Sequence, residues 1–182
     1  GKTVIEVITG EDKVDYLIIE LSSFQLHWST HLRLQSAAIL NIADDHLDWH
    51  GSFPEYLAAK KRITNGAKQI IINRDDRHLN SIEFKGDHKL VKFTLDAPRP
   101  GEIGVVEELL VDRAFVDDPQ EAIALAELSD INPQAPHNVA NALAAMALAR
   151  SCGVNAESIA KGLRNFTPGH HRIEEIENSA GI

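Results

Sequence analysis

The sequence contains one cysteine, no long apolar run and no extended basic run, and each absence excludes a class of protein. Cys152 stands alone, so an internal disulfide is impossible and a reducing, cytoplasmic setting is expected. No apolar stretch approaches the roughly 20 residues of a membrane span, and no signal peptide is visible. The 27 acidic residues outnumber the 18 Lys and Arg, which argues against nucleic acid or an anionic membrane as the main partner.

The apolar segments that are present are short, and three of them have the uninterrupted pattern of strands buried on both faces of a parallel sheet. These segments are 16–19, 37–42 and 69–74. Helices are expected over 53–64, from 136 to about 152, and over 156–165. Between 78 and 128 the pattern changes to short alternating stretches at 89–95, 104–111 and 122–128, with Gly and Pro between them. That pattern predicts a small antiparallel sheet.

These elements predict one domain over residues 1–182, with the antiparallel subregion at 78–128 inside it. The expected fold class is α/β, a mostly parallel sheet flanked by helices together with a small antiparallel sheet. At 43% hydrophobic residues, the chain can bury a substantial core.

Glu20 ends the first predicted strand, and Ser22 follows it. Ligands of open α/β sheets bind beyond the carboxyl ends of the strands, where an acid is well placed to hold magnesium beside phosphate groups. The alternative is a strand that ends at a solvated glutamate, followed by a serine N-cap. The stretch alone does not separate these two interpretations.

A loop rich in Asp and His follows the second predicted strand. It brings Asp44, Asp45, His46, Asp48 and His50 into seven positions, which favours metal or phosphate binding over a polar loop with capping aspartates. The i, i+2, i+4 spacing within it resembles the start of some metallohydrolase motifs. A divalent-metal-dependent hydrolase that uses the 44–50 cluster is therefore one hypothesis, and a non-catalytic binding domain is another.

The helix predicted over 53–64 carries a lysine in an unusual position. Ser52 and Glu55 have capping-box spacing, and a 3.6-residue period places Lys60 within the apolar stripe, with Lys61 and Arg62 pointing more outward. Such a lysine either extends its amine to solvent or is desolvated. Burial lowers the pKa of an amine, and a neutral amine can add carbon dioxide to form a carbamate, which can bind metal. Periodicity alone favours the solvent-reaching lysine.

Two asparagines and one arginine near the end of the chain are candidate nucleotide contacts. Asn138 and Asn141 lie three residues apart at a helix start and share a face, and side-chain amides can pair with adenine or ribose. Asn138 has the alternative role of an N-cap. Arg172 is a candidate phosphate clamp, with a surface salt bridge as its alternative.

Five motifs carry these candidates: Glu20–Leu26 (ELSSFQL), Asn41–Asp48 (NIADDHLD), Tyr56–Lys60 (YLAAK), His137–Asn141 (HNVAN) and His171–Glu174 (HRIE). In this order, over nearly the whole chain, they resemble the central ATPase domain of the Mur ligases. The chain departs from the family at 135–136, where Ala-Pro replaces a lead containing Gly, and at 169–170, where Gly-His replaces Leu-Pro. The named side chains remain available.

The resemblance implies ATP-dependent amide bond formation in peptidoglycan precursor synthesis, and so a role in the cell wall, cell shape and cell division. In that reaction a substrate carboxylate attacks the γ-phosphate of ATP and forms an acyl phosphate and ADP. The amine of D-glutamate then displaces phosphate. The nucleotide-sugar substrate implied is UDP-N-acetylmuramoyl-L-alanine. Two Mg²⁺ ions are the implied metals, and a monomer is expected.

The resemblance also assigns roles residue by residue. Glu20 and His46 are implied metal ligands, and Lys60 is implied to be carbamylated and to support the second magnesium. These three are the implied catalytic residues. Ser22 and His46 are implied substrate contacts, and Asn138, Asn141 and Arg172 are implied to face the nucleotide. The resemblance therefore reverses the interpretation of Lys60 that periodicity favours.

The family's glycine-rich phosphate loop does not occur in these residues. Gly1-Lys2-Thr3 resembles the end of such a loop, but the preceding strand and earlier glycines are missing, so it is interpreted as part of a connector or helix end over 1–10. The first strand of the family fold, the domain that binds the UDP group and the domain that carries the D-glutamate site are likewise expected outside the 182 residues. The chain alone is expected to be a partial, inactive enzyme with an uncovered sheet edge that favours association.

Overall fold

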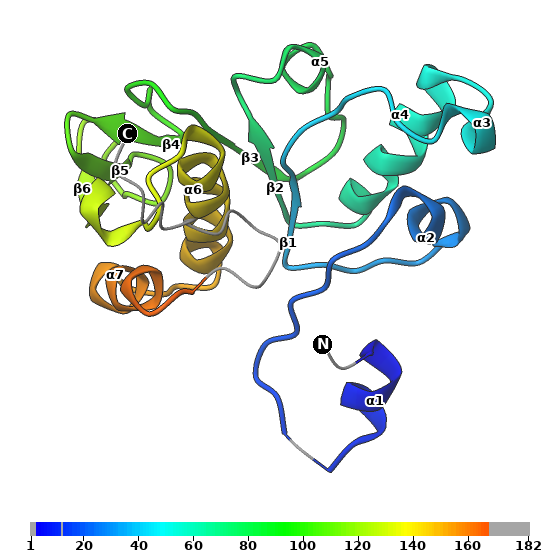
Figure 1. Ribbon diagram of the computed structural model, residues 1–182, viewed down its shortest axis with the longest axis horizontal. Coiled ribbons are helices and arrows are strands. Elements are labelled where there is room, and N and C mark those ends of the chain that lie inside the picture. The colour runs from blue at the N-terminus through cyan, green and yellow to red at the C-terminus, as the bar shows by residue number, and fades with distance from the viewer. Residues whose placement is uncertain (1–2, 12, 168–182) are drawn as a thin grey trace, which may run out of the picture.

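A six-stranded sheet in the order β1-β2-β3-β4-β5-β6 forms the centre of the computed structural model, which describes residues 3–11 and 13–167 (Figure 1). The strands are β1 (Ser36–Ile39), β2 (Gln69–Asn73), β3 (Lys89–Phe93), β4 (Glu102–Val106), β5 (Leu109–Asp112) and β6 (Ile123–Glu127). Neighbours from β1 to β4 pair in parallel, and β4–β5 and β5–β6 pair antiparallel. The predicted fold class is confirmed.

Two details of the predicted sheet are wrong. The antiparallel strands continue the parallel sheet instead of forming a separate one, and β3, expected in the antiparallel region, pairs in parallel with β2. The stretch 104–111, expected as one strand, contains most of the β4–β5 hairpin, which turns at Glu107 with a φ of 54°. A short alternating pattern does not reveal the direction of its neighbour, because pairing direction depends on the path of the chain between strands.

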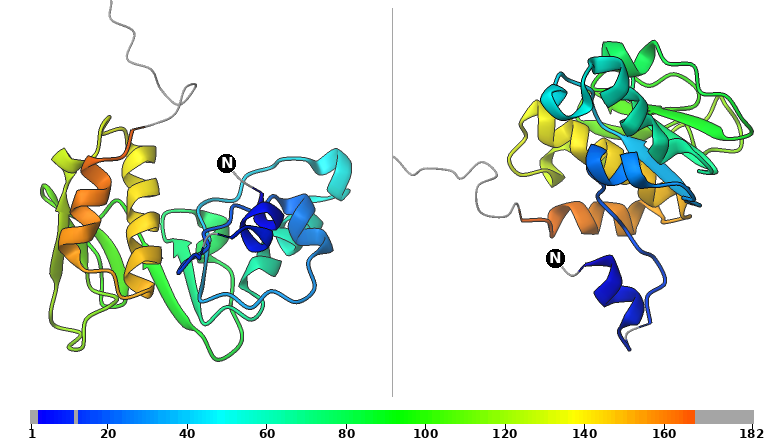
Figure 2. Two further views of the ribbon diagram at one scale, coloured as in Figure 1. Left: turned by 90° about the horizontal axis from the view of Figure 1, so that it is seen from below. Right: turned by 90° about the vertical axis from the view of Figure 1, so that its right-hand side faces the viewer.

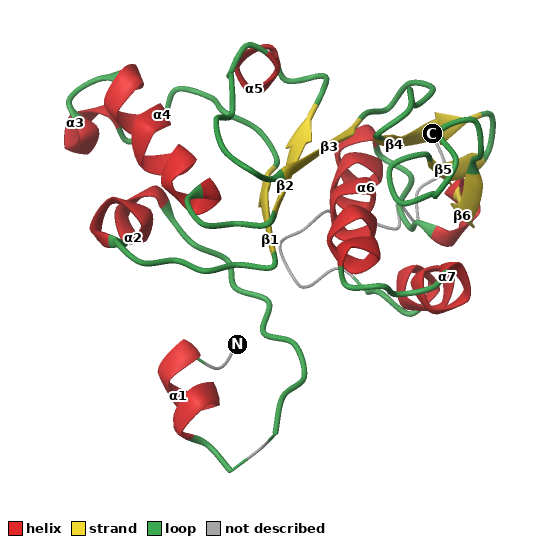
Figure 3. Ribbon diagram, turned by 180° about the vertical axis from the view of Figure 1, so that it is seen from behind, coloured by secondary structure: helices red, strands yellow, loops and turns green. Residues whose placement is uncertain are grey.

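Helices, turns and loops make up the rest of the described chain (Figure 3). The helices are α1 (Val4–Thr9), α2 (Ser23–Trp28), α3 (Leu47–His50), α4 (Phe53–Lys61), α5 (Arg77–Asn80), α6 (Pro136–Ser151) and α7 (Ala156–Arg164), with 3-10 turns η1 (Arg62–Thr64) and η2 (Leu128–Asp130). The helices predicted over 53–64, from 136 and over 156–165 are confirmed. Among the described residues, no helix combines the length and apolar character that a membrane crossing requires.

Two apolar cores cover the two faces of the sheet, and β2 contributes to both. Ile71 packs into the core formed with α6 and α7, whereas Ile70 and Ile72 pack into the core formed with α4 and α5. Successive side chains of a strand point to opposite faces, so an all-apolar strand indicates that both faces are covered. Seen from below, α6 and α7 lie side by side at one end, and α2 to α4 lie at the other (Figure 2).

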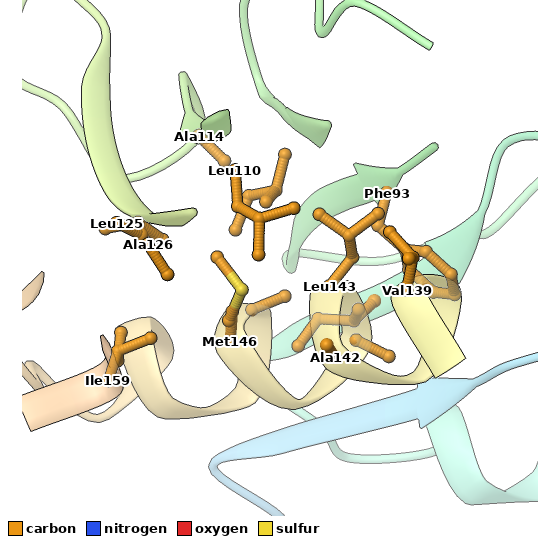
Figure 4. Packing of buried hydrophobic residues seen from close by; sticks show 14 of the residues in the cluster. Phe93, Leu110, Ala114, Leu125, Ala126, Val139, Ala142, Leu143, Met146 and Ile159 are labelled. Atoms are coloured by element: carbon orange, nitrogen blue, oxygen red, sulfur yellow. The ribbon is translucent and has the colours of Figure 1, made fainter. Parts of the chain in front are cut away.

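The longest described helix, α6, packs against β1 to β4. Leu143 points toward Phe93, and Met146 points toward Leu110 on β5 (Figure 4). These four side chains are at most 1% exposed, and burial of each contributes about 1.5–3 kcal/mol. The helix ends where predicted, with Gly153 in the left-handed region at a φ of 80°.

The end of α6 is joined to β5 by a buried ion pair. Asp112 is fully buried, and its Oδ2 accepts from Nε of Arg150 at 2.8 Å. Its Oδ1 accepts from the backbone N–H groups of Ala114 and Phe115 at 2.7 and 2.9 Å. The guanidinium of Arg150 also donates to the carbonyls of Val154 and Phe115. Most of the polar capacity of the pair is therefore satisfied inside the protein.

The prediction of a buried strand at 16–19 is wrong. The segment forms neither a helix nor a strand, and Tyr16 and Ile18 are 65% and 89% exposed. An apolar strand is buried only when neighbouring strands pair with it and helices cover it, and among residues 3–11 and 13–167 neither occurs. This segment leads from α1, which lies away from the sheet, to α2 (Figure 1).

In α1 the pKa of Glu6 is lowered, because the backbone N–H of Thr3 donates a hydrogen bond to the Glu6 carboxylate. The Thr3 hydroxyl donates to the same carboxylate and makes a smaller contribution.

Candidate functional site

A cavity of about 240 Å³ opens where β1, β2 and β3 end and α6 begins. The strand ends and the residues just beyond them contribute Leu40, Asn41, Asn73, Phe93 and Leu95, and α6 contributes Pro136, His137, Ala140 and Asn141. The lining combines apolar side chains with amide and imidazole groups in about equal measure, which suits a small polar ligand. Its location is that of ligand sites in open α/β sheets.

Two aspartates fix the loops around this cavity. Asp75 follows β2 and accepts from the Thr94 hydroxyl at 2.6 Å and from the backbone N–H of Leu95 at 2.8 Å, which ties the ends of β2 and β3 together. Asp76 caps α5 and accepts from the backbone N–H of Ile42 at 2.8 Å, which ties the loop after β1 to the loop after β2. The rim of the cavity is therefore held in place before any ligand binds.

The two candidate asparagines of α6 have different surroundings. Asn141 lines the cavity. The amide of Asn138 donates to the carbonyl of Pro133 at 2.9 Å, and this residue is not part of the cavity lining. The N-cap of α6 is Ala135, so the alternative role of Asn138 as N-cap is wrong. Arg172 lies outside the described residues.

A cluster of aromatic and histidine side chains joins α2, α3 and α4, and we call it the aromatic cluster. Its members are Phe24, His27, His46, Trp49, His50 and Tyr56. The ring centroid of Phe24 lies 4.8 Å from that of His46 and 5.7 Å from that of His50. The rings of His50 and Tyr56 are 5.4 Å apart, and Lys60 Nζ lies 5.6 Å from the Tyr56 centroid. The cluster thus connects the elements that carry Ser22, His46 and Lys60.

His46 has a strained backbone at the start of α3. Its φ and ψ are 53° and 32°, in the left-handed region that residues other than glycine rarely adopt. Its Nε2 lies 3.3 Å from Oδ2 of Asp45, and both side chains are about half exposed. Strain of this kind costs about 1–3 kcal/mol and concentrates at functional sites. The imidazole is accessible, and its position is fixed by its neighbours.

Two further candidates, Glu20 and Ser22, lie on the segment that leads into α2, and both are exposed. Ser22 caps α2 through a capping box with Gln25, whose side chain accepts from the serine hydroxyl at 3.0 Å. That hydroxyl keeps capacity to accept a further hydrogen bond.

Lys60 is half-buried, as are Lys61 and Arg62. The expectation that Lys61 and Arg62 point more outward is wrong. Lys61 donates to the carbonyl of Glu83, and Arg62 donates to that of His27, because the loop at 83 and helix α2 pack against this end of α4.

A complete protein-built metal site is absent from the part of the chain that the structure describes. No group of three or more His, Cys, Asp or Glu side chains in it converges as metal ligands, so no observation favours the metallohydrolase hypothesis for the 44–50 cluster. His50 of that cluster is buried, with Nε2 3.0 Å from the hydroxyl of Ser23. A magnesium ion that shares its shell with phosphates and water needs only one or two protein ligands. The exposed carboxylate of Glu20 supplies the oxygen donors that Mg²⁺ prefers.

The sequence pattern did not single out three polar residues of the cavity, namely Asn41, Asn73 and His137. Asn41 and Asn73 are the polar residues at or just beyond the ends of two apolar strands. The same signal singles out Glu20 and could have identified them. His137 lies in the first turn of α6, one residue before Asn138.

The Mur ligase middle domain family matches residues 6–149, and the chain belongs to this family. Three curated relatives share the name UDP-N-acetylmuramoylalanine–D-glutamate ligase. The one from Thermobifida fusca is 53% identical, that from Streptomyces coelicolor 49% and that from Mycobacterium tuberculosis 42%. Each alignment covers the whole chain but only 40%, 40% and 36% of the relative, so the chain spans well under half of their length.

A solved structure supports the same family. The crystal structure of MurF from Acinetobacter baumannii aligns with a TM-score of 0.57 at 25% identity, over 80% of this chain and 32% of that one. The shared architecture is the mostly parallel sheet flanked by helices.

Proposed function

We propose that the chain forms the nucleotide-binding part of an ATP-dependent ligase that joins D-glutamate to UDP-N-acetylmuramoyl-L-alanine in peptidoglycan precursor synthesis. The observation that carries the proposal is the cavity at the ends of β1, β2 and β3, with Asn141 of α6 in its wall. The name shared by the curated relatives supports the choice of substrates.

In the proposed site the amides around the cavity bind the nucleoside of ATP. Asn141 offers both a donor and an acceptor, as does each of Asn41 and Asn73, and this matches the mixed edge of adenine and the ribose hydroxyls. Asn138 acts from the preceding turn of α6, where its bond to Pro133 restrains it. Arg172 is proposed as the phosphate clamp. The apolar wall from Leu40 and Phe93 excludes water from one side of the base.

The proposed catalytic residues lie around the aromatic cluster. Glu20 and His46 would hold magnesium, and a carbamate on Lys60 would support a second ion. When bound, these ions neutralise charge on the phosphates. Ser22 and His46 are proposed to contact the substrate. The strained, accessible His46 and the half-buried Lys60 beside Tyr56 support these roles.

The residues 41–46 link the two regions. Asn41 lines the cavity, and His46 contacts Phe24 of the aromatic cluster. The backbone between them is anchored by the bond from Ile42 to Asp76. This short connection is suited to fix the nucleotide relative to the residues that act on its phosphates, since positioning accounts for much of phosphoryl-transfer catalysis.

A chimera tests the function. The 182 residues replace the aligned segment of the Thermobifida fusca relative, and phosphate release is measured with both substrates and ATP. We expect the chimera to release phosphate only when UDP-N-acetylmuramoyl-L-alanine and D-glutamate are both present, with one amide bond formed for each phosphate released. The isolated chain should show negligible release, because its residues include no glycine-rich phosphate loop. Robust turnover by the isolated chain, or a folded but inactive chimera, would contradict the proposal.

The nucleotide contact has its own test in the chimera. Asn141→Ala should raise the KM for ATP about threefold to tenfold, the worth of one hydrogen bond, with little change in the KM for D-glutamate. The matched control is Asn80→Ala, which removes an exposed amide on α5 that accepts from Lys92 and lies outside the cavity lining. Equal effects of the two variants on the KM for ATP would count against the cavity as the nucleotide site.

A further inference from the structure

The far end of α3 is joined to α2 by a buried hydrogen bond. His50 ends α3 and is 9% exposed, and its Nε2 lies 3.0 Å from the hydroxyl of Ser23, which is 3% exposed. Either group can be the donor, depending on the histidine tautomer. The bond connects residues 27 positions apart.

Phe24, the residue after Ser23, contacts both ends of α3. The ring of Phe24 lies 4.8 Å from that of His46 at the start of the helix, and it stacks on His50 at 5.7 Å with 14° between the planes. A helix of four residues has little stability of its own, so contacts with neighbours set its orientation. The left-handed backbone of His46 also requires neighbours that hold it.

We propose that Ser23 and His50 are positioning residues for His46. Their hydrogen bond holds α3 against α2, and Phe24, held between the two ends of α3, keeps the His46 imidazole beside the segment that carries Glu20 and Ser22. The inference rests on the proposed function in one respect, namely that His46 binds magnesium. The structural part of the inference, the dependence of His46 on the Ser23–His50 bond, stands on its own geometry.

The isolated chain tests the structural part without metal or substrate. Nuclear Overhauser contacts between the rings of Phe24 and His46 are measured for Ser23→Ala, His50→Leu and His50→Gln. We expect both nonpolar replacements to abolish the contacts and His50→Gln to retain them, because the glutamine amide can reach the Ser23 hydroxyl. Trp28→Ala is the control, since Trp28 is 76% exposed and contacts His27 rather than His46. Ring contacts that persist in both nonpolar variants would overturn the inference.

The chimera tests the consequence for magnesium. In Ser23→Ala and His50→Leu, the Mg²⁺ concentration at half-maximal rate should rise about tenfold, with near wild-type values in His50→Gln and Trp28→Ala. A purely structural defect lowers the folded fraction, and with it the rate, but leaves that midpoint unchanged. If His50→Leu fails to fold, Ser23→Ala, which removes one oxygen atom, decides the result. An unchanged midpoint in folded variants would overturn the positioning role. An inactive chimera would refute the proposed function, and the ring contacts would still decide the positioning.

Discussion

Replacing Asp112 with alanine should lower the free energy of unfolding by about 3–5 kcal/mol, as for other buried ion pairs that lose one partner. The substitution leaves the guanidinium of Arg150 facing the fully buried site of the lost carboxylate, and it removes the acceptor of the Ala114 and Phe115 N–H groups. Urea denaturation followed by circular dichroism measures the change. Equal m-values for the variant and the wild type would show that the compactness of the folded and unfolded states is the same in both.

Arg164→Ala provides the matched control for Asp112→Ala. Arg164 pairs with Asp130 at 3.1 Å, but its side chain is 56% exposed. Exposed pairs contribute about 0–1 kcal/mol, so this variant should change stability little. A loss of less than about 1 kcal/mol for Asp112→Ala, or equal losses in the two variants, would show that the Asp112–Arg150 pair does not hold α6 to β5.

Replacing Lys60 with alanine should lower kcat of the chimera by about 10–100-fold, the usual effect of removing a group that supports a bound metal. If the lysine acts as a carbamate, the variant lacks a carboxylate, not a positive charge. Added acetate or formate, which can enter the space left by the side chain, should then restore part of the rate. Steady-state phosphate release with and without the acid measures both effects.

Lys61→Ala is the control for this prediction. Lys61 is the next residue along α4 and is also half-buried, but its amine donates to the carbonyl of Glu83 on the far loop. Its replacement should change kcat by less than about threefold. The hydrogen bond that is lost does not involve the proposed site, and its loss should lower the stability of the fold by only about 0.5–1.5 kcal/mol. Full activity of Lys60→Ala, or a loss that no small acid restores, would contradict the carbamate.

The elements that could be predicted from sequence are those whose pattern reflects their own burial. The isoleucines of β2 predict a strand covered on both faces, and both cores contain them. The same pattern at 16–19 gave a wrong result, because burial of a strand depends on partners that the pattern does not contain. The helix period of α4 placed Lys60 within the apolar stripe, and its side chain is half-buried with Nζ 5.6 Å from the centroid of the Tyr56 ring. The period did not show that a distant loop and α2 also cover Lys61 and Arg62.

The candidate site could be predicted in part for a similar reason. Polar residues after apolar strands mark the edge where ligands bind, and Asn141 lies at that edge. Sequence spacing placed Asn138 on the same face, but the local chain path directs its amide to Pro133. The roles of Asp75 and Asp76 follow from hydrogen bonds between loops far apart in the sequence, so neither periodicity nor spacing indicates them.

The strand order of the sheet has a consequence for how the protein forms. Each strand from β1 to β5 pairs with the strand that follows it in the sequence, so among the six described strands none has to insert between two earlier ones. We therefore expect the sheet to grow by addition at one edge, in the order in which a ribosome releases the chain. Helix α6 follows all six strands and packs across β1 to β4. One face of the nascent sheet therefore remains exposed until α6 has left the ribosome, and chaperone capture should concentrate before that point.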